Sequence, residues 1–204
     1  MYRSTRACLW AAAAVPLIYF GAQAAAAPFY PNFSFALHTA SELGSNLSSH
    51  PNILNAGAAI SGSLSLIGAW GLFDALRSRS VWLVLALLVA ACCASFGLAS
   101  LWAASHPLPD PAHNSGALGA GMFAAPFVVF LASLRLTRAK PLRIYLAANI
   151  VAFLLVACIY SGLVPVDLPQ YAGAVQRLGA FVMLLPSAVL AFWLLRNEPH
   201  ASNQ

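Results

Sequence analysis

Residues 81–104 read VWLVLALLVAACCASFGLASLWAA and contain no charged side chain. A helix needs roughly 20 mostly apolar residues to cross a bilayer, so this stretch is long enough to span one. In hydrocarbon the backbone has no water to bond to, and a helix pairs its polar groups internally. The stretch therefore predicts a membrane-spanning helix.

The rest of the chain has the same character. Of its 204 residues, 61% are hydrophobic and 7% are charged, whereas soluble domains carry about 25% charged residues. Apolar stretches of span length occur at about 7–27, 52–73, 81–104, 115–134, 143–164 and 174–195. We therefore expect an all-α fold, a polytopic transmembrane helix bundle of six spans. It forms a single integral membrane domain over residues 1–204, and its main partner is the lipid bilayer.

Basic residues mark one side of this bundle. They precede the first span, lie in the loops after the second and fourth spans, and follow the sixth: Arg3, Arg6, Arg77, Arg79, Arg135, Arg138, Lys140, Arg143 and Arg196. Arg177, at the outer start of the last span, is the exception. Lys and Arg favour cytoplasmic loops, so we expect a protein of the cell inner (plasma) membrane with both termini cytoplasmic. Because the net charge of +5 is spread over short loops, it does not indicate nucleic-acid binding.

The first span has a second interpretation. A basic start, an apolar centre from Cys8 to Phe20 and an Ala-Gln-Ala sequence at 22–24 resemble a cleavable secretory signal. Cleavage would leave five spans and place the new N-terminus outside. The apolar run continues to Ala27, which is long for a signal and favours retention of the span.

The outer segments, at about 28–51, 105–114 and 165–173, hold most of the histidines and acids. Together with Arg177 at the outer end of the last span, the candidate site residues of this face are His38, Glu42, His50, His106, Asp110, His113 and Asp167. Residues 35–43 are expected to form a short amphipathic helix at the interface, with His38 and Glu42 on one face. Asp110 and His113 are expected to approach each other across a Pro-braced turn.

This group of side chains allows three interpretations. A network of hydrogen bonds and ion pairs closing the outer end is favoured, because a cation such as Arg177 near lipid needs a partner. The acids expected as its partners are Glu42, Asp110 and Asp167. A polar pocket for a ligand or a lipid headgroup is the second interpretation. A divalent metal site is the third, since imidazole and carboxylate bind zinc, but no HExxH-type signature is present. We predict no metal site and no cofactor.

The spans hold few ionisable groups, which argues against a proton or ion pump. We expect a non-catalytic protein that binds a lipid, a small apolar ligand or a partner at its outer face. The alternative is a membrane-embedded hydrolase or transferase that uses His113 with Asp110 or Glu42 as acid and base. A carrier of a neutral solute is a weaker alternative. The sequence does not indicate the oligomeric state.

Three segments carry a resemblance to a known family. Pro28-Phe-Tyr-Pro is followed by Thr39-Ala-Ser-Glu42-Leu-Gly44, Leu108-Pro-Asp110 is followed by His113, and Gly173-Ala-Val-Gln176-Arg177 leads into the last span. These segments resemble the bacterial domain-of-unknown-function 998 family, although Leu108 replaces an aromatic residue and Gln176 an acid. The resemblance implies six helices, a retained first span and an outer site built from Glu42, Asp110, His113 and Arg177. We define these four residues as the candidate outer polar site, and His38, His50, His106 and Asp167 are the second-rank candidates. It implies no known reaction.

Overall fold

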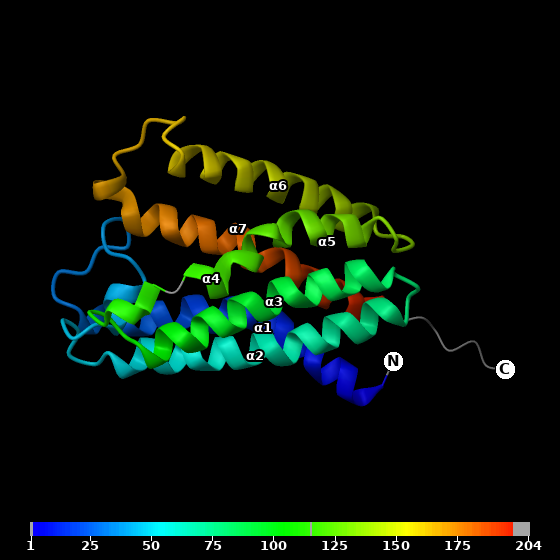
Figure 1. Cartoon of the computed structure of the whole chain (residues 1–204), viewed down its shortest axis with the longest axis horizontal. Coiled ribbons are helices and arrows are strands. Elements are labelled where there is room, and N and C mark those ends of the chain that lie inside the picture. The colour runs from blue at the N-terminus through cyan, green and yellow to red at the C-terminus, as the bar shows by residue number, and fades with distance from the viewer. Residues whose placement is uncertain (1, 115, 198–204) are drawn as a thin grey trace.

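The computed structural model describes residues 2–114 and 116–197, and these form a bundle of long helices lying alongside one another (Figure 1). Six segments are long and apolar enough to cross a membrane: α1 (Arg3–Ala26), α2 (Asn52–Arg77), α3 (Leu83–Ser105), the compound segment Pro111–Ser133, α6 (Lys140–Tyr160) and α7 (Leu168–Arg196). No strand occurs in the described part of the chain. The prediction of an all-α bundle with six spanning segments is confirmed.

The fourth spanning segment is not the continuous helix expected at 115–134. It consists of the 3₁₀ turn η3 (Pro111–Asn114), the short α4 (Gly116–Gly119), the 3₁₀ stretch η4 (Ala120–Ala124) and α5 (Ala125–Ser133). Three glycines lie within the α4–η4 stretch and lower its helix propensity. Pro126 lies in the first turn of α5, where its missing N–H is tolerated, but its ring disfavours α-helix in the turn before it.

Small residues set the close spacing of α1, α2 and α3. A Cβ atom added to Gly68 of α2 would lie 2.7 Å from the Cβ of Ala12, and one added to Gly62 would lie 2.8 Å from the Gly97 carbonyl oxygen. The Ser65 hydroxyl also donates to the Cys93 carbonyl at 2.8 Å. In lipid, helices associate through such close packing and interhelical hydrogen bonds, so these contacts hold the first three helices together.

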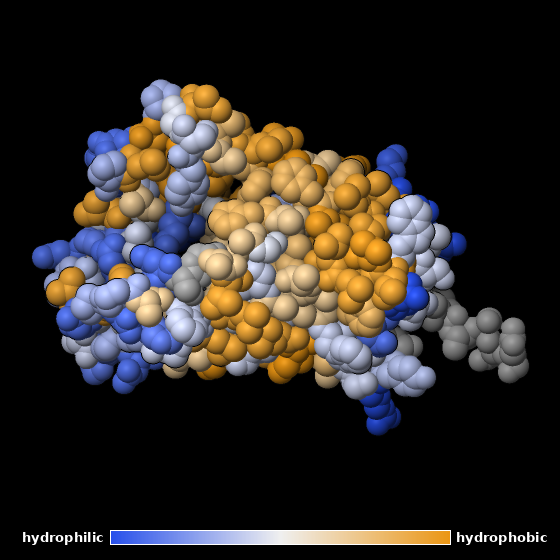
Figure 2. Space-filling view, viewed as in Figure 1, coloured by the Kyte–Doolittle hydropathy of each residue, from blue (hydrophilic) through white to orange (hydrophobic). Residues whose placement is uncertain are grey.

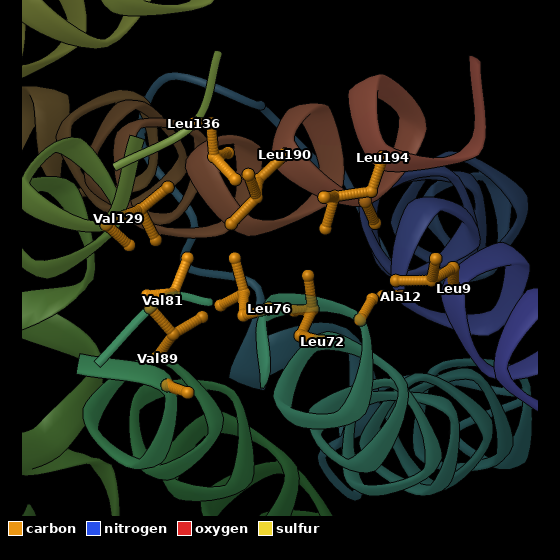
Figure 3. Close-up of a cluster of buried hydrophobic side chains, with 14 of the residues drawn as sticks. Leu9, Ala12, Leu72, Leu76, Val81, Val89, Val129, Leu136, Leu190 and Leu194 are labelled. Carbon is orange, nitrogen blue, oxygen red and sulfur yellow. The ribbon is translucent and has the colours of Figure 1, made fainter. Parts of the chain in front are cut away.

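Tightly packed leucines and valines fill the end of the bundle near the N-terminus (Figure 3). They come from the first half of α1, the ends of α2 and α7, the loop before α3, the first turns of α3, and α5: Leu9, Leu72, Leu76, Val81, Val89, Val129, Leu190 and Leu194, all with no exposed surface. This end is therefore closed by side chains, while long loops cover the opposite end.

The surface divides into zones along the long axis. Figure 2 shows an apolar belt between two more hydrophilic ends. The loops after α2 and α5 lie at the same end as the N-terminus, and the long loop between α1 and α2 lies at the other (Figure 1). This distribution is that of a multi-pass membrane protein.

Candidate outer polar site and the cavities beneath it

The long loop between α1 and α2, residues 27–51, lies across the first turns of α7. The backbone N–H of Gly173 donates to the Leu37 carbonyl at 3.3 Å, and that of Ala174 donates to the Ala36 carbonyl at 3.0 Å. Tyr171 has non-helical backbone angles (φ −120°, ψ 16°), and this kink directs the two N–H groups to the loop. A Cβ atom on Gly173 would collide with the His38 carbonyl, so a glycine is needed at this contact.

The amphipathic helix expected over residues 35–43 is absent. The chain forms turns at 35–38 and the single 3₁₀ helix η2 (Ser41–Gly44). The carbonyls of Ala36 and Leu37 bond to α7 and do not close turns of a local helix. This prediction was wrong because the backbone partners of the loop lie far along the chain.

Arg177 of α7 donates hydrogen bonds to the backbone of the same loop. Its Nη1 donates to the carbonyls of His38 at 2.7 Å and Phe35 at 2.9 Å. The guanidinium carbon also lies 5.5 Å and 5.0 Å from the ring centroids of Phe33 and Phe35, which is cation–π distance. Nε and Nη2 are buried without a hydrogen-bond partner. The described hydrogen bonds of Arg177 therefore go to backbone carbonyls, not to the acids predicted as partners.

The Glu42 carboxylate accepts hydrogen bonds from groups of its own loop. Its Oε1 accepts from the Thr39 backbone N–H at 3.0 Å and from the Thr39 hydroxyl at 2.8 Å, and its Oε2 accepts from the Tyr30 hydroxyl at 3.4 Å. Burial raises the pKa of Tyr30, and the neighbouring Glu42 carboxylate raises it further. Tyr30 therefore remains a hydrogen-bond donor, and Glu42 shapes the turn before η2.

His113 joins the second outer loop to the first. Its Nδ1 lies 2.7 Å from the His106 carbonyl oxygen, and its Nε2 lies 2.9 Å from the Ser41 hydroxyl. The Asp110 side chain accepts from the Ala112 backbone N–H at 2.8 Å, and the Asp110 carbonyl accepts from the His113 N–H at 3.0 Å. Asp110 therefore shapes the turn, and the expected contact between the two residues is made by their backbones.

Two second-rank histidines belong to the first loop. Nδ1 of His38 accepts from the Ser34 backbone N–H at 3.0 Å. The exposed ring of His50 packs edge-on to Phe29, with 4.7 Å between the ring centroids. Both contacts are local to the loop.

The other two second-rank residues sit at helix ends. The ring of His106 follows α3 and stacks on Trp102 at 4.0 Å. Asp167 precedes α7 and caps it, accepting from the Gln170 backbone N–H at 3.4 Å. Among the described residues, no three His, Cys, Asp or Glu side chains form a group that could hold a metal ion.

Side chains outside the predicted site also bond the first outer loop to α7 and α2. The Gln176 side-chain oxygen accepts from the Ala40 backbone N–H at 2.7 Å, and the Asn55 amide donates to the Gly44 carbonyl at 3.1 Å. Ser41 receives the His113 ring. The structure thus brings His113 and Arg177 to segment 38–44, which contains Glu42, while Asp110 and Asp167 accept hydrogen bonds from their own turns. The resemblance segments contain Ser41 and Gln176, which is the only signal in the sequence for either.

We call the two outer loops, residues 27–51 and 106–114, the cap of the bundle. A cavity of about 630 Å³ lies beneath this cap, walled by α1, α3, η4, α6 and α7. Most of its lining side chains are apolar, and its polar ones are Tyr19, Tyr160, Ser161 and Gln176. Tyr160 and Phe123 line it and are also 55% and 52% exposed, so the cavity opens sideways between α6 and η4. Figure 2 shows a hollow in the surface near the end that carries the long loop.

A second cavity, of about 160 Å³, lies directly under the cap. Its polar lining comes from both outer loops and from α1, α2 and α3: Tyr19, Ser41, Asn55, Ser100 and His113. It shares three lining side chains with the larger cavity, namely Tyr19, Phe96 and Met122. The two cavities therefore meet at these side chains, two of which, Tyr19 and Phe96, form an edge-to-face pair with ring centroids 5.7 Å apart.

Comparisons with known proteins identify a family without an assigned activity. No curated protein and no protein of solved structure matches the chain. Residues 12–193, which are most of the chain and include both outer loops and the start of α7, match the family described as "Protein of unknown function (DUF998)". The chain therefore belongs to the DUF998 family, as its outer-loop segments predict.

Proposed function

We propose that this is a multi-pass protein of the plasma membrane, with both termini in the cytoplasm, that binds a lipid or a similar amphiphile in the cavity beneath its outer cap. The observation that carries the proposal is the cavity of about 630 Å³ with its sideways opening. Ligand pockets of proteins typically enclose about 300–1,000 Å³ and are lined mainly by apolar groups. The exposed lining residues Tyr160 and Phe123 lie on segments of span length, so the ligand would enter from the bilayer.

The wall chemistry favours a ligand with an apolar tail and one polar end. Phe123, Phe153, Val156 and Met183 offer apolar surface, and no lining residue carries a formal charge. The hydroxyl and amide groups of the cavity suit a headgroup that exchanges hydrogen bonds. Burial of a lipid chain contributes about 0.8 kcal/mol per CH₂ only relative to water, so selectivity over bulk lipid depends on these polar contacts.

A binding role agrees with the packing better than transport does. The fully buried cluster of Leu72, Leu76, Leu190 and their neighbours fills the end near the N-terminus. A carrier needs a passage through that end, and in this structure the end is occupied by side chains. The cap itself consists of polar groups that already bond to backbone atoms, as expected of a closure.

The test is lipid co-purification with a cavity-filling variant. A Cβ atom on Gly179 would lie 3.7 Å from Val156 and 3.8 Å from Met183 and Tyr160, so Gly179→Leu fits at its first carbon and extends among cavity side chains. Gly21→Leu is the matched control, because nothing lies within 4 Å of its Cβ position. Both variants and the wild type are purified in mild detergent, and bound lipid per chain is measured by mass spectrometry.

We expect bound lipid in the wild type and in G21L, and about tenfold less in G179L, equivalent to about 1.4 kcal/mol of binding free energy. A G179L protein with wild-type thermal stability and undiminished lipid would exclude the cavity as the binding site.

A further inference from the structure

Ser41 and His113 have the relationship of a nucleophile and its general base. The Ser41 hydroxyl lies 2.9 Å from Nε2 of His113, although 72 positions separate the two residues. Nδ1 of His113 lies 2.7 Å from the His106 carbonyl oxygen. A carbonyl can only accept, so Nδ1 carries a proton, and the neutral form of the ring presents the lone pair of Nε2 to the Ser41 hydroxyl. This is the tautomer that a general base requires.

The pair faces a space that a substrate can enter. Ser41 and His113 both line the cavity of about 160 Å³, and both side chains are only partly buried. Asn55 lines the same cavity, and its amide nitrogen donates one hydrogen to the Gly44 carbonyl and carries a second. Tyr19 adds a hydroxyl to the wall. Such donors stabilise the oxyanion that forms when a carbonyl is attacked.

The adjoining cavity determines the class of substrate. Tyr19, Phe96 and Met122 line both cavities, so a molecule can place an apolar tail in the larger one and a polar linkage beside Ser41. A carboxylic ester with a long acyl chain matches this arrangement. Water has access from the outer rim, where His113 and the loops reach the surface.

We propose that Ser41 and His113 form a catalytic dyad that cleaves lipid-like carboxylic esters. The Ser41 oxygen bonds to the ester carbonyl carbon while its proton passes to Nε2 of His113. The bond to the leaving alcohol then breaks, and His113 returns the proton to that alcohol. Water activated by the same histidine hydrolyses the acyl-serine, releasing the carboxylic acid and restoring the serine hydroxyl. The proposal rests on the lipid site of the preceding section, because the larger cavity holds the acyl chain.

The experiment uses the full-length protein in detergent and fluorophosphonates, in which a serine oxygen displaces fluoride from phosphorus. We expect a long-chain alkyl fluorophosphonate to label Ser41, identified by peptide mass, and to leave Ser41→Ala unlabelled. Ser49→Ala is the matched control. Ser49 is an exposed serine of the same loop that lines neither cavity, and its hydroxyl donates to the Phe29 carbonyl at 3.1 Å, so S49A is expected to label at the wild-type rate.

The His113→Gln variant distinguishes a catalytic role of His113 from a role in connecting the two outer loops. A glutamine amide can accept the Ser41 hydrogen bond but cannot take up its proton, so H113Q is expected to keep the wild-type melting temperature. Its labelling rate is expected to fall by about a hundredfold or more, the range of general-base contributions. Equal labelling of H113Q and wild type would overturn the dyad, as would an unlabelled Ser41 in the wild type.

The Gly179→Leu variant distinguishes failure of the Ser41–His113 dyad from failure of the lipid site. We expect a short-chain fluorophosphonate to label G179L normally and the long-chain probe to label it slowly. If wild-type protein carries cavity lipid while Ser41 stays unlabelled by either probe, the dyad fails and the lipid site stands. If G179L retains its lipid and reacts with both probes like wild type, the lipid site fails, and with it the assignment of the acyl chain to the larger cavity.

Discussion

Nη1 of Arg177 lies 2.7 Å from the carbonyl oxygen of His38, across 139 positions of sequence. The same nitrogen donates to the Phe35 carbonyl, and Gln176 beside it accepts from the Ala40 backbone. Two consecutive residues of α7 therefore bond to the backbone of the first outer loop at Phe35, His38 and Ala40. The cap over the cavities is fastened chiefly by side chain to backbone bonds, and its stability should depend on those side chains.

Replacing Arg177 with methionine should loosen the cap. The variant loses two hydrogen bonds from a charged donor and the stacking on Phe33 and Phe35, and we expect it to lose about 2 kcal/mol of unfolding free energy. Thermal unfolding in detergent and the rate of proteolysis within residues 27–51 measure the effect. Arg196→Met is the control, since Arg196 is exposed and stacks on exposed Phe192. Equal effects of the two variants would contradict the fastening role.

Gly173 tests the backbone contact separately. Gly173→Ala places a Cβ atom against the His38 carbonyl and 2.7 Å from Nη1 of Arg177, so we expect a destabilisation of about 1–3 kcal/mol from overpacking. Gly179→Ala, two turns further along α7, meets only ordinary contacts at 3.7 Å or more and should change stability by less than about 1 kcal/mol. A G173A melting temperature equal to that of G179A would show that the loop moves aside without cost.

Helix α1 should be retained in the mature protein. It packs against α2 through glycines, and Gly68 leaves space for Ala12. We expect the intact mass of protein purified from membranes to include residues 3–26, and we expect Gly68→Leu to lower the yield of folded protein strongly. Gly21→Leu, whose side chain enters open space, should express normally. A mass shortened by removal of α1 would establish signal cleavage.

Cysteine labelling tests the orientation. Ser49 and Thr137 are exposed at opposite ends of the bundle, in the loops after α1 and α5. In a background with Cys8 and Cys158 replaced by serine, a membrane-impermeant maleimide should label S49C in intact cells, and T137C only after permeabilisation. The reverse pattern would place the cap in the cytoplasm.

The fold class follows from composition because apolar length and charge distribution are properties of single segments. The positions of helices such as α3 can be read from one stretch of sequence for that reason. The outer loop cannot be read in the same way. Residues 35–43 have the periodicity of an amphipathic helix, yet their carbonyls bond to Gly173, Ala174 and Arg177. No local pattern specifies partners so far along the chain.

In the candidate site, likewise, the contacts within one turn could be predicted from the sequence and the contacts between separate loops could not. Asp110 and Asp167 serve local turns that flanking prolines make recognisable. The contact of His113 with Ser41 depends on the packing of two loops, and a serine among nearby serines gives no signal of its own. Residue type therefore identified the histidine, and only the three-dimensional structure identified its partner.

The interrupted fourth segment bears on how the larger cavity fills. Met122 and Phe123 line that cavity from η4, whose 3₁₀ hydrogen bonds are weaker in geometry than those of an α-helix. We therefore expect the η4 wall of the cavity to be more compliant than its walls on α1, α3, α6 and α7. Amide hydrogens of residues 120–124 should accordingly exchange faster than those of α3, and a bulky chain can enter by displacing a single turn while the rest of the bundle stays in place.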